Sequence, residues 1–346
     1  MKIRKAILTG GGRATRLRPV TSTMNKHLIP LANKPMIFHA IEKAVEAGIE
    51  EIFINTNPGE KDLPNYIGDG GHWGIKIHFF EQTGGPQGIA HVVKEAEKFI
   101  GQEPFMFYLS DNVVLGSLRG MFDEFVAGGH DSMIALAEVP NAGAFGVPYF
   151  DASGKLIDVV EKPENPPNNF AVTGIYLYGP GVFYKAFDHI TKSARGEYEI
   201  SSIHSYLLKN NYKMGHKVIT GWWKDTGQPD DLITANRLLM DETSSGKSKI
   251  GIGTTIGDNV KIIDPVIIGE NCTLENCTVG PYVTIGSGGT VRGGVKIENS
   301  IILNNCYIEI PEKIVGSIVG EKVRIERKHP ERHHRLILGD QTIIEM

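Results

Sequence analysis

Apolar residues follow two different periods along the chain, and the period changes near residue 245. Over the first 240 residues, short apolar runs typical of strands alternate with segments that carry apolar residues at helical spacing. The predicted strands are residues 3–8, 51–55, 76–80, 105–109 and 132–139. The clearest predicted helix begins at Pro35 and ends at Gly48. This alternation predicts an α/β fold with a doubly wound, mostly parallel sheet.

Beyond a polar segment at residues 241–249, apolar residues recur every six positions. They are Ile250, Ile256, Ile262, Ile268 and Leu274 and, after a shift of one residue, Val279, Ile285, Val291, Ile297 and Leu303. A period of six is typical of neither a helix nor an ordinary strand, and it predicts a parallel β-helix of hexapeptide repeats, which resembles the left-handed type. The predicted domains are therefore residues 1–240, a linker at 241–249, the β-helix at 250–320 and an extension at 321–346.

Composition narrows the class of protein. A net charge of −4 gives no electrostatic reason to expect nucleic acid as a partner. No apolar run reaches the length of a signal sequence or a membrane span, so we expect a cytoplasmic protein with no membrane partner. The three cysteines, Cys272, Cys277 and Cys306, have no metal-site spacing and are predicted to be reduced, packed thiols.

A glycine loop follows the first predicted strand. Gly10, Gly11 and Gly12 come directly after the apolar run 6–8 and lead into a cationic segment. Exposed main-chain N–H groups beside positive side chains are suited to a polyphosphate. The residues after the glycines fit neither the P-loop nor the dinucleotide fingerprint. A glycine-rich turn with solvated arginines is the alternative interpretation.

Residues 11–21 and 26–30 resemble the signature of the sugar-phosphate nucleotidyltransferases. Ala14 stands where the family has its third glycine, and Gly10 is one residue more than the pattern. Because alanine disfavours positive φ, we expect the loop to follow a slightly different path. The resemblance implies an enzyme of nucleotidyltransferase-like fold, in which Leu8 and the glycines at 10–12 bind the nucleotide.

The expected reaction is mostly a matter of position and charge. A sugar phosphate oxygen attacks the α-phosphorus of a nucleoside triphosphate, so cations and a carboxylate-held metal are needed. Arg16 and Lys26 are the candidates for the triphosphate and the leaving pyrophosphate, and Asp111 and Asp225 are the candidate ligands of Mg²⁺. Taken singly, an aspartate after a strand is more often a cap or turn residue.

Further motifs similar to the family appear in the expected order. Gln82 would hydrogen-bond a pyrimidine edge and Gly88 would let the base approach, although this stretch is one residue longer than usual. The sugar-binding motifs supply Gly146, Glu161, Lys162, Val172, Tyr176 and Glu197. The resemblance implies that most of these bind the sugar and that Lys162 bridges the sugar phosphate and the α-phosphate. Without its neighbours, Lys162 beside Pro163 would be read as an exposed turn residue.

The resemblance covers nearly the whole chain and is strongest to the long form of the enzymes that join dTTP to glucose 1-phosphate. It implies Mg²⁺-dependent transfer of a thymidylyl group, giving a dTDP-sugar and pyrophosphate. Uridylyl or guanylyl transfer to another hexose 1-phosphate remains an alternative. An acyltransferase site on the β-helix is a second alternative, disfavoured because no histidine lies between His216 and His329. A non-catalytic regulatory homologue, suggested by Ala14, is a third.

The role of the C-terminal part is a separate expectation. The open end and flat faces of a β-helix suit subunit packing, so we predict a homo-oligomer assembled partly through residues 250–320. The residues beyond 320 are rich in basic side chains, including those at 332–335. They are predicted to be a solvated extension, with an anion-sensing contact as the alternative.

Overall fold

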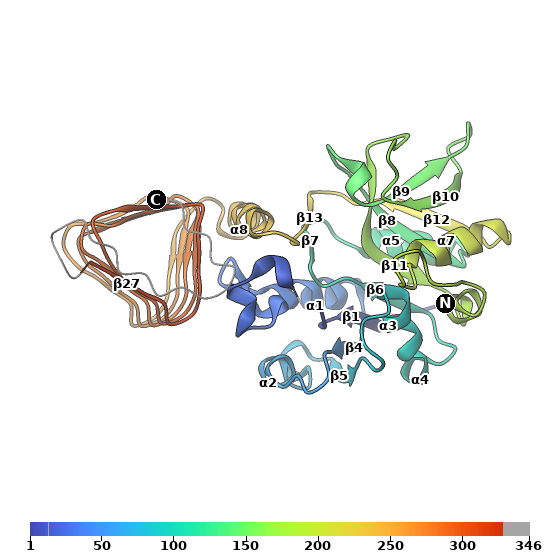
Figure 1. Cartoon of the computed structure of the whole chain (residues 1–346), viewed down its shortest axis with the longest axis horizontal. Helices are drawn as coiled ribbons and strands as arrows, with labels where there is room; N and C mark the ends of the chain where they lie inside the picture. The colour runs from blue at the N-terminus through green and yellow to red at the C-terminus, as the bar shows by residue number, and fades with distance from the viewer. Residues whose placement is uncertain (13, 328–346) are drawn as a thin grey trace. The chain divides into compact units, whose positions relative to one another are not determined.

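The structure is a computed structural model that describes residues 1–12 and 14–327 (Figure 1). The contacts between residues group the chain into two compact units. The first, which we call the sheet unit, comprises Met1–Arg13 and Ile37–Asp225. The second, which we call the C-terminal unit, comprises Ala14–Met36 and Thr226–Met346. The basic residues at 332–335 lie outside the described residues.

The sheet unit is built on seven strands in the order β12-β8-β11-β6-β1-β4-β5. Their bounds are Met214–Val218, Ser132–Glu138, Phe170–Tyr178, Phe105–Tyr108, Lys5–Thr9, Glu51–Thr56 and Lys76–Glu81. Only β11 runs antiparallel to its neighbours in this sheet. The prediction of a mostly parallel sheet is therefore confirmed, and the five predicted strands are all present.

Apolar side chains fill both faces of this sheet. Ile7, Phe53 and Phe107 belong to one buried cluster with residues of α3, α6 and α7. Ala6 and Leu8 point to the other face, because side chains alternate along a strand, and they are equally buried. The helices are α1 Met36–Ala47, α2 Asp62–Ile67, α3 Ile89–Glu95, α4 Glu97–Ile100, α5 Arg119–Gly128, α6 Val182–Phe187 and α7 Ile200–Lys209.

Two small antiparallel ribbons complete the sheet unit. The first pairs β9 (Gly146–Phe150) with β10 (Leu156–Glu161), and the second pairs β7 (Asn112–Val114) with β13 (Trp223–Asp225). Short 3₁₀ turns lie at Gly71–Trp73 and Ala142–Ala144. Both ribbons matter below because each joins predicted site residues that are distant in sequence.

The C-terminal unit begins with a segment of short elements and continues with one long helix. The segment holds the 3₁₀ turns η1 (Thr15–Leu17), η2 (Val20–Ser22) and η3 (Lys26–Leu28) and the hairpin of β2 (Pro30–Leu31) and β3 (Lys34–Pro35). The helix is α8 (Pro229–Ser244), whose start is fixed by a capping box of Gln228 and Asp231.

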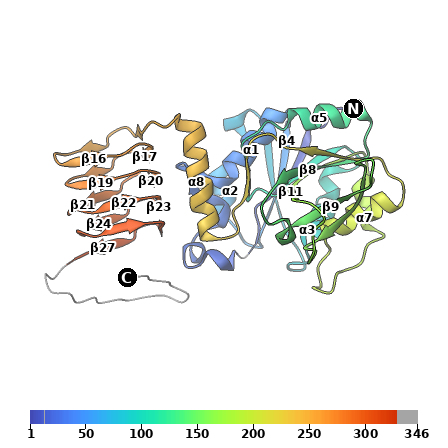
Figure 2. The same cartoon turned by 90° about the horizontal axis from the view of Figure 1, so that it is seen from above.

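Three parallel sheets follow α8 (Figure 2), and we call residues 249–326 the three-sheet region. The first sheet is β14 Lys249–Ile250, β17 Val266–Ile268, β20 Val283–Ile285, β23 Ser300–Ile302 and β26 Ile318–Val319. The second is β15 Thr255–Ile256, β18 Thr273–Leu274, β21 Thr290–Arg292, β24 Tyr307–Glu309 and β27 Arg324–Glu326. The third is β16 Val260–Ile262, β19 Cys277–Val279, β22 Lys296–Glu298 and β25 Lys313–Val315. This arrangement fits a β-helix.

The inner rows of the three-sheet region are apolar, as the repeat predicts. Ile268 lies beside Ile285, and Ile285 lies beside Ile302, so the inward residue of that row is Ile302 and not the predicted Leu303. The repeat slips a second time there because the strand Ser300–Ile302 aligns with Val283–Ile285. At the first turn, Ile250 and Ile256 remain 49% and 39% exposed.

Two further expectations can be compared with the described residues. The three cysteines are free and buried, as predicted for packed thiols. Among the helices of the described residues, none has the length and apolar character needed to cross a bilayer.

Candidate active site

The glycine loop leaves the sheet at the carboxyl end of β1 and is held there by β4. The main-chain N–H of Gly10 donates to Asn55 Oδ1 at 3.2 Å. Gly12 and Asn57 exchange two hydrogen bonds, at 3.0 and 3.2 Å. In an open α/β sheet, ligands bind beyond this edge of the strands. The predicted loop therefore lies where a ligand site is expected.

The extra glycine of this loop has a steric reason. A Cβ on Gly10 would lie 2.7 Å from the main-chain oxygen of Asn55, and one on Gly11 would lie 2.8 Å from Asn55 Nδ2. A side chain at either position would displace the loop from β4. Leu8 precedes the glycines and its side chain is fully buried, so only its main chain is available to a nucleotide.

Ala14 adopts the conformation that a glycine would adopt. Its φ is 42° and its ψ is 40°, in the left-handed region. A Cβ makes this region unfavourable by about 1–2 kcal/mol. Ala14 therefore carries a steric cost that a glycine at this position would not.

The two predicted metal ligands are brought together by the second ribbon. Asp225 ends β13 and pairs with Asn112 of β7, and Asp111 immediately precedes Asn112. Both aspartates are partly buried. Two carboxylates from adjacent strands, completed by phosphate oxygens and water, are a donor set that suits Mg²⁺, which takes few protein ligands. No cluster of three or more metal-ligating side chains occurs in residues 1–12 and 14–327.

A tryptophan orients one of these aspartates, Asp111, through Asn112. Trp223 Nε1 donates to Asn112 Oδ1 at 2.9 Å and lies 3.1 Å from the main-chain oxygen of Thr173. Asn112 Nδ2 in turn donates to Asp111 Oδ1 at 2.9 Å. The hydroxyl of Tyr108 donates to the main-chain oxygen of Asn112, and burial followed by the charge of Asp111 raises the pKa of this tyrosine well above its usual range.

The predicted sugar residues also converge. Glu161 lies opposite Gly146 in the pairing of β9 with β10. A Cβ on Gly146 would meet Glu161 Oε2 at 3.5 Å and Val172 at 3.6 Å. Burial raises the pKa of Tyr176, and the charge of Glu161 raises it further, which places the two side chains within electrostatic range. Predicted sugar-binding residues of β9, β10 and β11 thus lie close together.

The charges around Glu161 form a mixed cluster. Burial raises the pKa of Glu161, Lys162 opposes this rise, and Glu199 and Glu197 add to it. Arg195 binds Glu199, with 2.8 Å between Nη2 and Oε1. Lys162 itself has a φ of 47° and lies 4.0 Å from Glu161, measured from Nζ to Oε1. A lysine in the left-handed region is uncommon and is often found at functional sites.

The base segment contacts the last sugar motif. Gly88 has a φ of 97°, and a Cβ there would lie 2.6 Å from the main-chain oxygen of Tyr198 and 3.0 Å from Glu197 Cβ. Tyr198 N also donates to Gln87 O at 2.8 Å. Gln82 follows β5 and its main-chain N–H donates to Thr56 O at 3.0 Å, so it lies at the same sheet edge as the glycine loop.

Arg16 and Lys26 belong to the C-terminal unit. Arg16 lies on η1 and is exposed, whereas Lys26 begins η3 and is partly buried. Asn25 caps η3 by accepting a hydrogen bond from His27 N at 2.9 Å. The side chain of His27 is 3% exposed, so this single turn is fixed at its start and anchored by a buried ring.

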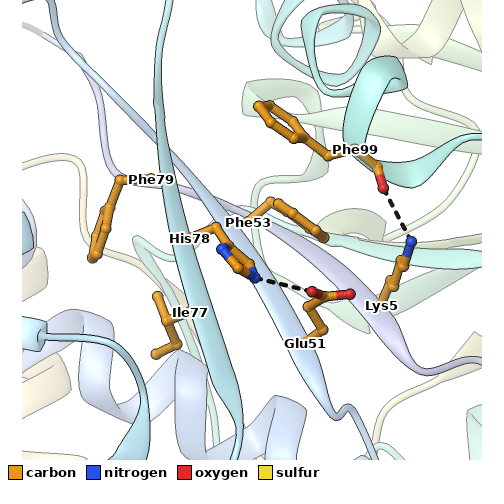
Figure 3. Close-up of a pocket in the computed structure, with 7 residues that line it drawn as sticks. All are labelled: Lys5, Glu51, Phe53, Ile77, His78, Phe79 and Phe99. Atoms are coloured by element: carbon orange, nitrogen blue, oxygen red, sulfur yellow. Dashed lines mark hydrogen bonds and ion pairs between the residues drawn. The ribbon is translucent and has the colours of Figure 1, made fainter.

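One surface pocket of the sheet unit lies away from all of these residues. It has a volume of about 560 Å³ and is lined by Lys5, Glu51, Phe53, Ile77, His78, Phe79 and Phe99 (Figure 3). Lys5, Glu51 and Lys76 begin β1, β4 and β5, so this is the opposite edge of the sheet from the glycine loop. Its polar groups already bind one another, as in the 2.9 Å contact between His78 and Glu51. We assign it no role in the site.

Several residues that support the site are not apparent in the sequence. Asn55 and Asn57 hold the glycine loop, Asn112 and Trp223 orient Asp111, and Arg195 fixes Glu199. The asparagines follow or end predicted strands, which is the one available signal. Nothing in the sequence marks Trp223, since its partners come from residues 112 and 173.

Comparisons with known proteins show the family to which the chain belongs. A family model described as "Nucleotidyl transferase" matches residues 5–242, and one described as "GMPPB C-terminal domain" matches residues 273–345. The chain is 35% identical, over 365 residues, to the low-salt glycan biosynthesis nucleotidyltransferase Agl11 of Haloferax volcanii. That alignment covers 99% of this chain and all of the relative.

Two further relatives have related activities. The glucose-1-phosphate thymidylyltransferase of Streptomyces griseus is 34% identical, and the alignment covers 98% of both chains. A solved protein of Bacillus anthracis, crystallised with a sucrose and assigned provisionally to the same activity, superposes with a TM-score of 0.63 at 34% identity. This superposition covers 68% of the present chain and 94% of the other.

Proposed function

The chain belongs to the nucleotidyl transferase family and is a sugar-phosphate nucleotidyltransferase, and from this premise we propose that it joins dTTP to glucose 1-phosphate. The products are dTDP-glucose and pyrophosphate. A phosphate oxygen of the sugar forms a bond to the α-phosphorus as the bond from that phosphorus to the β-phosphate oxygen breaks. The choice of thymidylyl and glucosyl groups is supported by the names of the relatives in Streptomyces griseus and Bacillus anthracis.

The cations are proposed to hold the phosphates. Lys162 bridges the sugar phosphate and the α-phosphate, where its positive charge stabilises the negative charge on the oxygens around the reacting phosphorus. Arg16 and Lys26 neutralise the triphosphate and the pyrophosphate that leaves. The glycines at 10–12 direct main-chain N–H groups at the nucleotide. The protein's contribution is thus to position and to stabilise charge.

Asp111 and Asp225 are the proposed ligands of a divalent cation, with Mg²⁺ as the best candidate. When bound, this ion supplies positive charge to the phosphate oxygens of the nucleotide. Trp223 and Asn112 keep the Asp111 carboxylate in one orientation through the hydrogen bonds described above. This support outside the ligand shell is usual for metal sites and tunes their affinity.

The sugar is proposed to lie against β9, β10 and β11. Glu161 and the main chain of Gly146 bond hydroxyl groups, and Val172 and Tyr176 line the space beside them. Glu197, which lies next to Gly88, also contacts the sugar. Gln82 lies at the same sheet edge as the glycine loop, and Gly88 lies against Glu197. The base and the sugar would therefore be bound by neighbouring segments.

The observation that carries the proposal is the pairing of β7 with β13. It brings Asp111 and Asp225, which lie far apart in the sequence, to neighbouring positions. A turn or cap role for each aspartate gives no reason for the two to meet. Uridylyl or guanylyl transfer would use the same aspartates, so base preference has to be measured.

The test is a matrix of nucleoside triphosphates against hexose 1-phosphates, read as pyrophosphate release. We expect the highest kcat/KM with dTTP and glucose 1-phosphate. A higher value with UTP or GTP would replace the proposed base, and silence with every pair alongside tight binding of a sugar nucleotide would favour the regulatory alternative. Acetyl transfer from acetyl-CoA to the product sugar would support the bifunctional alternative.

The remaining proposals concern the C-terminal region and the setting. We propose that the three-sheet region is a left-handed parallel β-helix at residues 250–320, joined by a linker at 241–249 to a catalytic domain at 1–240. We also propose a cytoplasmic homo-oligomer assembled partly through that region. A chain ending near Thr243 should then sediment as a smaller assembly than the full chain.

A further inference from the structure

The hairpin of β2 and β3 lies a few residues after Lys26 and turns through two left-handed residues. Ala32 has a φ of 50° and Asn33 a φ of 58°. Two positive φ values at the centre of a two-residue hairpin loop are the pattern of a type I′ turn, which usually contains asparagine and glycine. Alanine is unfavourable in this conformation, so contacts from outside the hairpin have to hold the turn.

The side chain of Asn33 supplies one of these contacts. Its Nδ2 donates to the main-chain oxygen of Ile285 at 2.8 Å and to that of Ile267 at 3.3 Å. Ile285 O also accepts from Gly269 N at 2.7 Å, so both of its lone pairs are used. Because two carbonyl oxygens face this side chain, only an NH₂ group fits there and the orientation of the amide is determined.

Helix α8 holds the other side of the turn. The main-chain N–H of Ala32 donates to Asn236 Oδ1 at 2.7 Å, and Asn236 is 1% exposed. The Arg237 guanidinium lies 4.6 Å from the centre of the Tyr282 ring, which ties α8 to the three-sheet region. The tip of the hairpin is therefore clamped by both elements.

The sheet face beneath this clamp is closed to solvent. Ile267, Thr284 and Ile301 alternate with the inward residues of their strands and so point outward, yet they are 9%, 0% and 0% exposed. Helix α8 contacts β23 and runs beside this sheet (Figure 2). The segment that carries Arg16 and Lys26 is thus packed as part of the C-terminal unit.

We propose that Asn33 is a positioning residue through which the three-sheet region fixes Lys26 for nucleotidyl transfer. The proposal rests on the phosphate-binding role proposed above for Lys26. Since η3 and the hairpin are consecutive, release of the hairpin tip gives the Lys26 turn more conformations. The three-sheet region then contributes to catalysis without touching a substrate.

Two substitutions separate the anchor from the turn. Asn33→Gly keeps the preferred residue for a left-handed turn and removes the amide. Asn33→Asp keeps the size and shape of the side chain but sets a carboxylate against two carbonyl oxygens. We expect kcat/KM for the nucleotide to fall on the order of tenfold in Asn33→Gly and further in Asn33→Asp, because small misplacements of a positioned group are costly. The KM for glucose 1-phosphate should stay within about twofold.

Two controls match these changes. Ala32→Gly eases the turn and keeps the anchor, and Asn211→Gly makes the same replacement at an exposed asparagine with a φ of 60° in the sheet unit. Both should retain kcat/KM within about twofold. Equal losses in Asn33→Gly and Asn211→Gly would overturn the proposal, since the effect would then belong to glycine and not to the anchor.

A second readout does not depend on activity. Hydrogen exchange of the substrate-free protein should rise on the order of tenfold in residues 26–36 of Asn33→Gly and stay unchanged in residues 146–161. Unchanged exchange at 26–36 would overturn the anchor, and faster exchange with full kcat/KM would overturn the positioning role. If the wild-type chain transfers no nucleotide at all, the function proposed above fails while the exchange result still decides whether the anchor exists.

Discussion

The residues proposed above to bind phosphate and metal come from two regions that are built in different ways. In the sheet unit, Lys162 directly follows β10 and Asp111 directly precedes β7, and main-chain pairing fixes the register of both strands. In the C-terminal unit, Lys26 lies on a single 3₁₀ turn between a loop and a hairpin whose own loop has two residues. The first region inherits its geometry from a sheet, and the second depends on side chains such as Asn25 and Asn33.

The two regions should therefore respond differently when a single side chain is removed. Strand register is cooperative, so removal of one side chain changes the chemistry at that position and leaves the frame intact. A segment of short turns has few internal hydrogen bonds, and its conformation can be lost when one outside contact is removed. The predictions below use this contrast, from the largest expected effect to the smallest.

The largest effect is expected at the two lysines. Lys26→Ala and Lys162→Ala should each lower kcat by about two to three orders of magnitude, the range observed when one preorganised charge-stabilising group is lost. Steady-state pyrophosphate release measures both. Lys155→Ala, which changes an exposed lysine in the turn before β10, is the matched control and should leave kcat unchanged.

The two lysines also test the contrast itself. Lys162→Ala leaves a residue with a Cβ in a left-handed conformation. Lys162→Gly should therefore be more stable than Lys162→Ala, because glycine adopts this conformation without steric cost, but it should be equally inactive. If Lys26→Ala retained wild-type kcat while Lys162→Ala did not, the segment at 14–36 would not carry the phosphate site, and the comparison would lose its second half.

The sequence predicts the sheet unit well because its site residues follow strand ends. Asp111 and Gly10 are each marked by an apolar run that ends in a polar or glycine residue, and Asp225 comes shortly after two tryptophans at the end of β13. The supporting residues are different: Trp223 contacts Asn112 and Thr173, and Asn33 contacts Ile267 and Ile285. Local patterns carry no information on such long-range pairs, so the grouping of residues 14–36 with the C-terminal unit could not be predicted.

A fall in pH should lower the stability of the sheet unit through a buried histidine, His204. Burial lowers the pKa of His204 to about 3. A hydrogen bond of 2.8 Å joins its Nε2 to the hydroxyl of Tyr178. The unfolded chain binds a proton near pH 6.5 and the folded chain does not, so stability is lost as the pH falls below 6.5. Between pH 7 and 5 this amounts to about 2 kcal/mol.

Urea unfolding at pH 7 and pH 5 measures this loss. All three tryptophans, Trp73, Trp222 and Trp223, lie in the sheet unit, so their fluorescence reports that unit. Burial raises the pKa of Glu161, so this carboxyl makes the folded chain more stable as the pH falls, opposite to the effect of His204. The variant His204→Gln keeps Glu161 and removes the histidine, so the difference between wild type and variant isolates the contribution of His204. An equal pH dependence in wild type and His204→Gln would contradict the assignment.

Trp223→Phe should have a smaller effect, on metal binding. The phenyl ring can keep the contact with Phe145, whose ring centre is 5.1 Å from that of Trp223, but it loses both hydrogen bonds of Nε1. The Asp111 carboxylate is then less well oriented, and we expect the half-saturating Mg²⁺ concentration to rise about tenfold. A Mg²⁺ titration of initial rates measures it.

Trp222→Phe is the matched control for this experiment, because it changes the neighbouring indole and leaves both bonds of Trp223 in place. Its Mg²⁺ dependence should equal that of the wild type. A shift of equal size in both variants would mean that bulk at this ribbon, and not the oriented amide of Asn112, determines the affinity.

The smallest effect is expected at Ala14, where the two regions of the comparison meet in the sequence. Ala14→Gly removes about 1 kcal/mol of left-handed strain from the folded chain, but glycine gives the unfolded chain a similar amount of additional entropy. The two terms nearly cancel, so the melting temperature should change by no more than a few degrees and kcat by less than about twofold. Thermal melts and steady-state rates measure these quantities.

Ala32→Gly is the paired variant, since Ala32 is also left-handed but its neighbour anchors the turn. A gain in kcat of tenfold or more in Ala14→Gly alone would show that the strained loop limits turnover, and that the weak point of the segment is its start and not the hairpin.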